Sequence, residues 1–227
     1  MIYNSDDNVV QVYADSAWET VGTPSTISVD FVLVGGGGSA HKTYGSGGGA
    51  AGGVISTVDN TGGGGTLPSA AAIVPGEDYK VTIGAGTNKN GMAVGLSQFG
   101  KYIAIGGGSG GSQSRWSGPS GGAGRHVGVY HNCPRLASAY GSADPWIEMT
   151  GAANAQLYTG STGNSSLGLA GGAGAGGNGS QSGGGVGVIC NILTITQATA
   201  ASVGEVNSSN VYFGGGGGGG HYSGSVN

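Results

Sequence analysis

VYFGGGGGGG, from Val211 to Gly220, joins an apolar triplet to seven consecutive glycines near the end of the chain. Glycine accounts for 55 of the 227 residues. Each glycine loses more backbone entropy on folding than any other residue and buries no side chain, so a glycine run usually behaves as a linker. Here the runs alternate with strand-like apolar segments that disordered chains lack. The pattern therefore predicts that the glycine runs belong to a folded domain.

Apolar segments at residues 32–34, 103–105 and 211–213 run directly into glycine tracts. We expect an all-β fold with extensive irregular structure, in which strands lie beside or beneath the tracts. A glycine row can adopt the polyproline II conformation, whose N–H and C=O groups point outward and can bond to neighbouring rows. The sequence thus favours packed polyglycine II helices, and the alternative is loops at the ends of a β-sandwich. The absence of a strict Gly-X-Y period excludes collagen.

Further strands are predicted from local patterns. Residues 27–34 alternate and then become continuously apolar, as in a strand that enters a core. Residues 188–193 also resemble a buried strand. Pro75-Gly76 predicts a turn, and residues 79–83 alternate as one face of a strand. The alternating apolar positions are Ile27, Val29, Phe31, Tyr79, Val81 and Ile83.

The first 22 residues differ from the rest and predict strand, polar turn, strand, short turn and strand. We therefore divide the chain into a small N-terminal β-meander with its linker (residues 1–26) and a glycine-rich domain (residues 27–227). A meander this short cannot bury both of its faces. Its aromatic residues Tyr3, Tyr13 and Trp18 need a partner surface, supplied either by the following domain or by other copies of the chain.

Two segments resemble a known family. The pattern from Ile2 to Trp18 resembles a segment of phage tail fibres and other virion appendages, although an unrelated meander is the alternative. The stretches FVLVGGGG, from Phe31, and PGEDYKVTIGAG, from Pro75, resemble the glycine-rich domain of phage tail fibre and adhesin proteins. The resemblance implies a polyglycine II lattice, a homotrimer, attachment to other virion proteins through the meander, and a place in the virion. A loop insertion at about residues 113–169 departs from the family.

We expect a non-enzymatic tail fibre or receptor-binding adhesin that displays loops for attachment to a host glycan or outer-membrane protein. A capsid decoration, head-fibre or collar protein is the alternative. The insertion is rich in aromatic residues, which together with arginine dominate binding hot spots, although they could instead fill a small core beneath the loop. The candidate receptor-binding residues are Trp116, Tyr130, His131, Tyr140, Trp146, Tyr158, His221 and Tyr222.

Catalytic and cofactor signals are weak. Asp144 and Glu148 flank Trp146 as a glycosidase pair would, so a polysaccharide depolymerase is a less favoured reading. Gly-x-Gly-x-x-Gly matches lack the strand, helix and acidic residue that dinucleotide binding requires. Cys133 and Cys190 belong to no Cys-x-x-Cys pattern, and the four histidines are scattered. We expect no enzyme activity, no metal and no cofactor, and the pairing of the two cysteines stays open.

Charge and hydropathy limit the classes of partner that the chain can bind. Only 8% of residues are charged and the net charge is −4, so nucleic acid is an unsuitable partner. Membrane insertion is not expected, because no segment has about 18 or more consecutive apolar residues. The polar, acidic start lacks the cationic and apolar regions of a signal peptide. This favours assembly in the host cytoplasm, or a fragment of a longer chain.

Overall fold

The fold is broadly all-β, with small antiparallel sheets in two compact units. The first unit comprises Met1–Val29 and Ala71–Asp78, and the second comprises Asp30–Ala70 and Tyr79–Asn227. The division predicted at residue 26 stays a prediction. The computed structural model describes residues 2–4, 9–14, 16–21, 26–40, 47–86, 95–108, 171–180 and 183–219.

The first unit contains the predicted meander. Its strands β1 (Ile2–Asn4), β2 (Val9–Ala14) and β3 (Ala17–Thr20) pair antiparallel in the order β1-β2-β3. A separate two-stranded ribbon joins β4 (Ile27–Val29) to β7 (Ala71–Ile73). The prediction of a three-stranded meander at the N-terminus is confirmed.

The strand predicted over residues 27–34 is divided in two. Its second half is β5 (Val32–Val34), which belongs to the other unit. Ile27 and Val29 in β4 are 56% and 37% exposed, so the prediction that they enter a core is wrong. The reason is that β4 belongs to a ribbon of two strands, and such a ribbon has no second layer to cover its faces. Phe31, between the two halves, is buried as expected.

The second unit holds the remaining sheets. The apolar segments predicted to lead into glycine tracts form β5, β10 and β13, which confirms this part of the prediction. The strand orders are β5-β6, β10-β9-β8 and β11-β13-β12. The elements are β6 (Val54–Ser56), the 3-10 turn η1 (Gly62–Gly64), β8 (Val81–Thr82), β9 (Ser97–Phe99), β10 (Tyr102–Ala104), β11 (Val188–Ile189), β12 (Glu205–Asn207) and β13 (Asn210–Phe213).

The turn at Pro75-Gly76 forms as predicted. The Glu77 N–H donates to the Val74 carbonyl at 3.2 Å, and Gly76 has φ of 89°, the positive value that a type II turn requires at its third residue. The strand that follows is shorter than predicted. Val81 and Ile83 are 62% and 79% exposed, so their face covers no core.

One helix, α2 (Ile195–Ala201), is absent from the sequence-based predictions. It begins at a capping box: the Gln197 N–H donates to Thr194 Oγ1, and the Thr194 N–H donates to Gln197 Oε1 at 2.9 Å. These reciprocal bonds satisfy N–H groups that the first helical turn leaves unpaired. The strand predicted over residues 188–193 therefore ends at Ile189, and the chain turns toward the helix.

The core of the second unit lies where its strands run into the glycine tracts. Val54, Ala175 and Val188 are buried together, and three partly buried side chains pack against them: Val32, Val34 and Phe213. These residues come from β5, β6, β11 and β13 and from one glycine tract, so the sheets and the tracts share one core.

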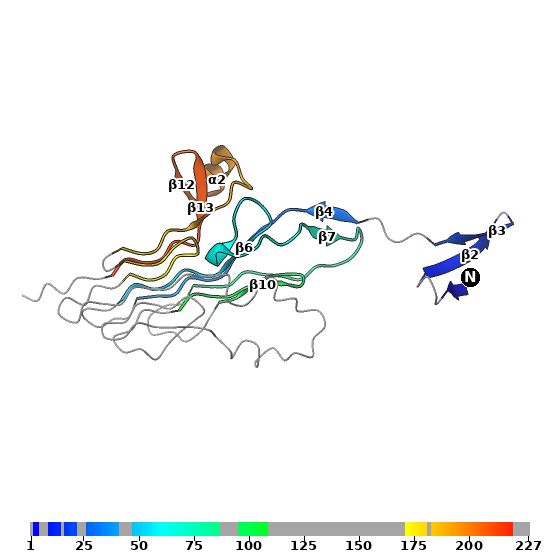
Figure 1. Cartoon of the computed structure of the whole chain (residues 1–227), viewed down its shortest axis with the longest axis horizontal. Coiled ribbons are helices and arrows are strands. Elements are labelled where there is room, and N and C mark those ends of the chain that lie inside the picture. Colours follow the sequence, from blue (N-terminus) through cyan, green and yellow to red (C-terminus); the bar gives the residue numbers. More distant parts are fainter. Residues whose placement is uncertain are drawn as a thin grey trace, which may run out of the picture. The chain divides into compact units, whose positions relative to one another are not determined.

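Beyond this core, glycine-rich segments lie side by side and are joined by backbone hydrogen bonds (Figure 1). We call these segments rows. Their residues have neither strand nor helix assignment. In chain order they are row 1 (residues 35–39), row 2 (47–53), row 3 (105–108), row 4 (171–176), row 5 (183–187) and row 6 (214–219).

Hydrogen bonds between rows recur every third residue. Gly35 and Gly38 in row 1 donate to Gly53 and Ala50 in row 2, at 2.9 and 2.8 Å. The donors advance along row 1 while the acceptors move backward along row 2, so these rows are antiparallel. In an antiparallel sheet, donors to one neighbour are two residues apart, because alternate residues face opposite sides. The spacing of three therefore distinguishes the rows from strands.

The same spacing joins other rows. Ala50 and Gly53 donate to Gly108 and Ile105 in row 3, at 2.8 and 2.7 Å. In a third antiparallel pair, row 4 donates to row 6 from Gly172 to Gly217 and from Ala175 to Gly214, each at 2.8 Å.

Row 2 bonds to more neighbours than a strand can. Besides rows 1 and 3, it donates from Ala51 to Ala173 in row 4 and accepts at Gly49 from Gly217 in row 6. A strand in a sheet has hydrogen-bonded neighbours on two sides only. Row 2 is fully buried, and the rows around it therefore form a three-dimensional bundle rather than one sheet.

Close approach explains most of the glycines in this bundle. A Cβ atom added at Gly35 would lie well within 3 Å of the Ile105 carbonyl oxygen, closer than real Cβ atoms come to such atoms. The same conflict arises at Gly172 with Gly49 and at Gly216 with Gly172. Backbone occupies the space that a side chain would need, so these positions accept only glycine.

Candidate functional site

Hydrogen bonds between the rows bring residues from several glycine tracts together at one end of the bundle. Gly38 bonds to Ala50, Ala50 bonds to Gly108, and Gly172 bonds to Gly217, which in turn bonds to Gly49 next to Ala50. These residues form one connected group, on the side away from the strands that start rows 1, 3 and 6. We call this group the far end of the bundle.

Three intervals between or after the rows start or end near the far end. Residues 41–46 separate rows 1 and 2, residues 109–170 separate rows 3 and 4, and residues 220–227 follow row 6. The described residues that flank these intervals belong to the far end or lie within a few positions of it. Intervals that are far apart in the sequence are thus anchored at a common place.

The candidate receptor-binding residues fall in these intervals and lie outside the described residues. The same is true of the possible carboxylate pair Asp144 and Glu148 and of Cys133. Their roles stay predictions. The structure contributes the anchors: Gly108 and Gly171 flank the insertion, and Gly219 precedes the last residues. The residues concerned are Trp116, Tyr130, His131, Tyr140, Trp146, Tyr158, His221 and Tyr222.

The meander carries an exposed aromatic pair. Tyr13 and Trp18 face each other across β2 and β3, with ring centroids 5.3 Å apart in an edge-on arrangement. Their side chains are 58% and 48% exposed. Tyr3 lies in β1, and its side chain is outside the described part. Two exposed aromatic rings on a three-stranded sheet suit the predicted attachment or oligomerisation role, which stays a prediction.

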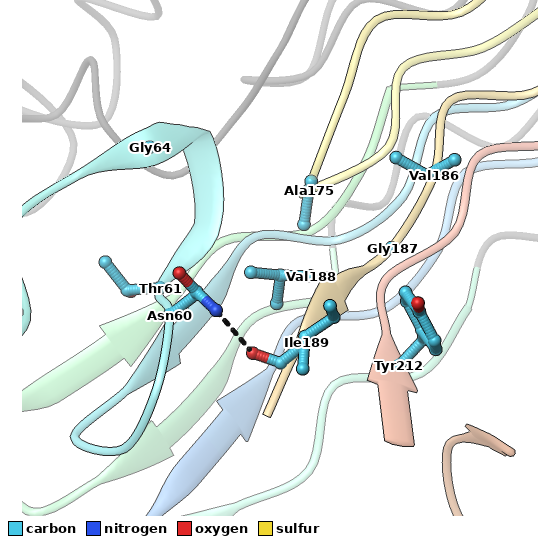
Figure 2. A pocket seen from close by; sticks show the side chains of 10 residues that line it. Asn60, Thr61, Gly64, Ala175, Val186, Gly187, Val188, Ile189 and Tyr212 are labelled. Carbon is cyan, nitrogen blue, oxygen red and sulfur yellow. Dashed lines mark hydrogen bonds between the residues drawn. The ribbon is translucent and has the colours of Figure 1, made fainter. Parts of the chain in front are cut away.

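A groove of about 290 Å³ lies between η1 and the β11-β13 pair. We call it the Asn60 groove. Figure 2 shows Asn60 on one side and Tyr212 on the other, with Val188 and Ile189 between them. Asn60 Nδ2 donates to the Ile189 carbonyl at 3.4 Å. The other lining residues are Thr61, Gly64, Ala175, Gly176, Val186 and Gly187.

The Asn60 groove is suited to binding a neutral group and not to acid–base chemistry. Its lining has no ionisable side chain other than the Tyr212 phenol. The Thr61 hydroxyl already donates to the Val54 carbonyl at 3.1 Å, so it serves the local fold. A mixture of apolar side chains, one amide and one phenol is typical of weak, neutral contacts.

A second groove, of about 460 Å³, shares the lining residues Gly187 and Tyr212 with the Asn60 groove. We call it the Val34 groove, because it reaches from Val34 at the start of row 1 to Gly214 and Gly215 in row 6. Glu205 is its one charged lining residue. The remaining lining residues are Gly187, Val203, Gly204, Tyr212 and Phe213.

Within the described ranges, no group of three or more His, Cys, Asp or Glu side chains could hold a metal ion. Cys190 is a free, fully buried thiol whose Sγ lies 3.0 Å from Ser56 Oγ. That hydroxyl also donates to the Val58 carbonyl, so the contact serves core packing. None of the helices in the described part has the length and apolar character needed to cross a bilayer.

The chain matches no family model, no curated protein and no solved structure.

Sequence reasoning missed the two grooves. Asn60, Val186 and Tyr212 come from three distant segments, and none of them belongs to a motif. Only the pairing of β11 with β13 and the position of η1 bring them together. The single local signal was the apolar segment at residues 211–213, which predicted a strand and not a groove.

Proposed function

We propose that the six rows are a bundle of polyglycine II helices. Three observations support this assignment. Bonds to one neighbour recur every third residue, as the three residues per turn of this helix require. Row 2 bonds to rows on more than two sides. A Cβ atom is excluded at Gly35, Gly172 and Gly216, which the close approach of such helices demands.

On this bundle we base the function: a non-enzymatic virion attachment protein that displays binding loops, as in a tail fibre or receptor-binding adhesin. The observation that carries the proposal is the far end, where row register anchors the intervals containing the predicted receptor-binding residues. Residues 109–170 and 220–227 thereby start from neighbouring points. One rigid support under several segments is the arrangement that a composite binding surface needs.

Rigid support has a thermodynamic benefit in binding. Ordering loops and side chains at an interface costs about 0.5–1.5 kcal/mol for each immobilised flexible side chain. Anchors that are fixed by backbone hydrogen bonds reduce the part of this cost that arises from the loop ends. Aromatic residues such as Trp116 and Trp146 add contact area with little rotamer entropy to lose.

In this proposal, the meander attaches the chain to other virion proteins or to further copies of itself. Its exposed Tyr13–Trp18 pair supports that role, because two rings with half their surface in water gain on being covered. The partner at the far end is a cell-surface glycan or an outer-membrane protein.

The test measures binding of the purified protein to host cells. Trp146→Ala should raise the dissociation constant for the cells about 30-fold, which corresponds to a hot spot worth about 2 kcal/mol, without lowering the unfolding temperature. Val206→Ala, at an exposed position of β12, is the control and should leave cell binding unchanged. Equal losses of binding and stability in Trp146→Ala would assign that residue to a core instead. Full binding by a variant with a short linker in place of residues 113–169 would contradict the proposal.

A further inference from the structure

The sheet β11-β13-β12 has two contrasting faces. Side chains alternate between the faces of a strand, so residues two apart share a face. Val188 and Val211 lie on one face and are buried. On the other face, Ile189, Tyr212 and Glu205 are directly opposite one another across the three strands. Ile189 and Tyr212 are partly buried and Glu205 is exposed, so this second face meets solvent.

Asparagines continue the solvent face. Asn207 and Asn210 pair with each other at the ends of β12 and β13, two residues along from Glu205 and Tyr212. Asn191 Nδ2 donates to Asn210 Oδ1 at 3.3 Å, which places the third amide beside this pair. Three amides therefore lie side by side, next to the strand positions that carry the phenol and the carboxylate.

The loop between β6 and η1 extends this face beyond β11. The Asn191 N–H donates to Asp59 Oδ2 at 2.7 Å, and Asn60 Nδ2 donates to the Ile189 carbonyl at 3.4 Å. Both loop residues are exposed, and Figure 2 shows Asn60, Ile189 and Tyr212 in succession. We call this surface the amide face. It consists of the Tyr212 ring, the two carboxylates Asp59 and Glu205, and the four amides of Asn60, Asn191, Asn207 and Asn210.

The amide face offers hydrogen-bond donors and acceptors but no cation. An amide both donates and accepts, whereas a carboxylate only accepts. Asn60 Oδ1 and the side-chain nitrogens of Asn207 and Asn210 bond to no described atom, so a ligand can reach them. The two carboxylates, Asp59 and Glu205, repel an anion. These groups therefore favour a neutral ligand whose polar groups both donate and accept.

Tyr212 adds an apolar surface to these polar groups. Its ring has Ile189 as its cross-strand neighbour, and both residues line the Asn60 groove of about 290 Å³. A cavity of about 150 Å³ holds one benzene ring, so the groove has room for one six-membered ring with its substituents. An aromatic ring beside amides suits a molecule that has an apolar side and a polar edge.

We propose that the amide face binds a neutral saccharide. A pyranose ring has C–H groups on its sides and hydroxyls around its edge, and each hydroxyl both donates and accepts. The C–H side packs on Tyr212, the amides of Asn60 and Asn210 bond to hydroxyls, and Glu205 accepts from another. The site lies on the β11-β13-β12 sheet and not in the intervals at the far end, so it goes beyond the display function.

The test is saturation-transfer NMR on the full chain, with glucose, galactose, mannose and N-acetylglucosamine as separate probes. We expect transfer to the ring C–H protons of at least one of them. Tyr212→Thr should weaken binding about tenfold or more, as the loss of an aromatic contact does, and Tyr212→Phe should stay within about threefold of the wild type. Val206→Ala, on the opposite face of β12, is the matched control and should leave the transfer unchanged.

Two further measurements separate the site from its alternatives. Glucuronic acid should bind about tenfold more weakly than glucose, because Asp59 and Glu205 repel its carboxylate. Asn60→Ser, in the loop outside the strands, should weaken sugar binding even if Tyr212→Thr lowers the unfolding temperature.

No transfer to any of the four sugars would overturn the proposal, and so would equal binding by the wild type and both Tyr212→Thr and Asn60→Ser. Binding of a lysine tripeptide without binding of any sugar would assign the face to a cationic partner and overturn it as well. Each of these results would leave the display function standing, because the effect of Trp146→Ala on cell binding is measured separately.

Discussion

The glycine rows and the segment from β11 to β13 are neighbours in the second unit, yet they are stabilised in opposite ways. The segment uses side chains: a capping box at Thr194 and Gln197, and the buried Val188 and Val211. The rows use backbone groups bonded across long sequence separations, from Gly217 to Gly49 for example. In the rows, adding a side chain would separate the backbones and break the hydrogen bonds between them. In the segment from β11 to β13, removing a side chain would break the contacts that stabilise it.

This contrast predicts the largest effect for Gly216→Ala. Its Cβ atom would collide with the carbonyl oxygens of Gly172 and Ala173, and backbone atoms in a bonded row cannot move aside cheaply. We expect the free energy of unfolding to fall by about 3 kcal/mol or more. Urea denaturation measures it. A loss below about 1 kcal/mol would mean that row 6 does not pack against row 4.

A smaller loss is expected from Val54→Ala, in the core that the rows share with the sheets. Val54 is fully buried and packs with Ala175 and Val188. Removing two buried methyl groups should cost about 2 kcal/mol, from lost burial and the cavity that remains. The same denaturation experiment checks this value. A variant as stable as the wild type would contradict a core common to rows and strands.

The cap of α2 gives the third effect. Thr194→Ala removes the side-chain acceptor of the Gln197 N–H, and we expect a loss of about 1 kcal/mol. Thr194→Ser keeps the hydroxyl and is the control. Because the helix is local, amide exchange in residues 195–201 should accelerate more than exchange in the rows. Equal acceleration in both regions would show that the two regions unfold as one unit.

The smallest effect is expected at Gly215→Ala, next to the most sensitive position. A Cβ atom there meets nothing among the described atoms, and the residue has no positive φ. The unfolding free energy should stay within about 0.5 kcal/mol of the wild type, or rise slightly because alanine loses less entropy. A strong loss at Gly215 would remove the distinction between inward and outward residues of row 6.

The sequence predicts those parts of the fold that are determined by a few neighbouring residues. Pro75-Gly76 specifies its turn by fixed φ at one residue and positive φ at the next. The meander follows from alternating segments and short turns. Strands before the glycine tracts follow from apolar triplets such as residues 211–213.

Other parts depend on partners far away in the sequence. Ile27 and Val29 alternate like core residues, but the ribbon with β7 leaves them exposed, and only the pairing partner decides this. The capping box at Thr194 is a local signal that the apolar run before it obscured. Whether a glycine such as Gly215 faces outward depends on how its row is aligned with the neighbouring rows. Sequence cannot predict this alignment, because the consecutive glycines of a run are identical.

The central claim is that the glycine rows form an ordered bundle, and amide hydrogen exchange tests it most directly. The account predicts strong protection of the N–H groups that bond between rows, at Ala50, Ala51, Gly53, Gly172 and Gly217, close to the protection of Cys190 in the core. Exchange of these five amides at the rate of an unstructured glycine peptide would contradict it, and the proposed display function would lose its support.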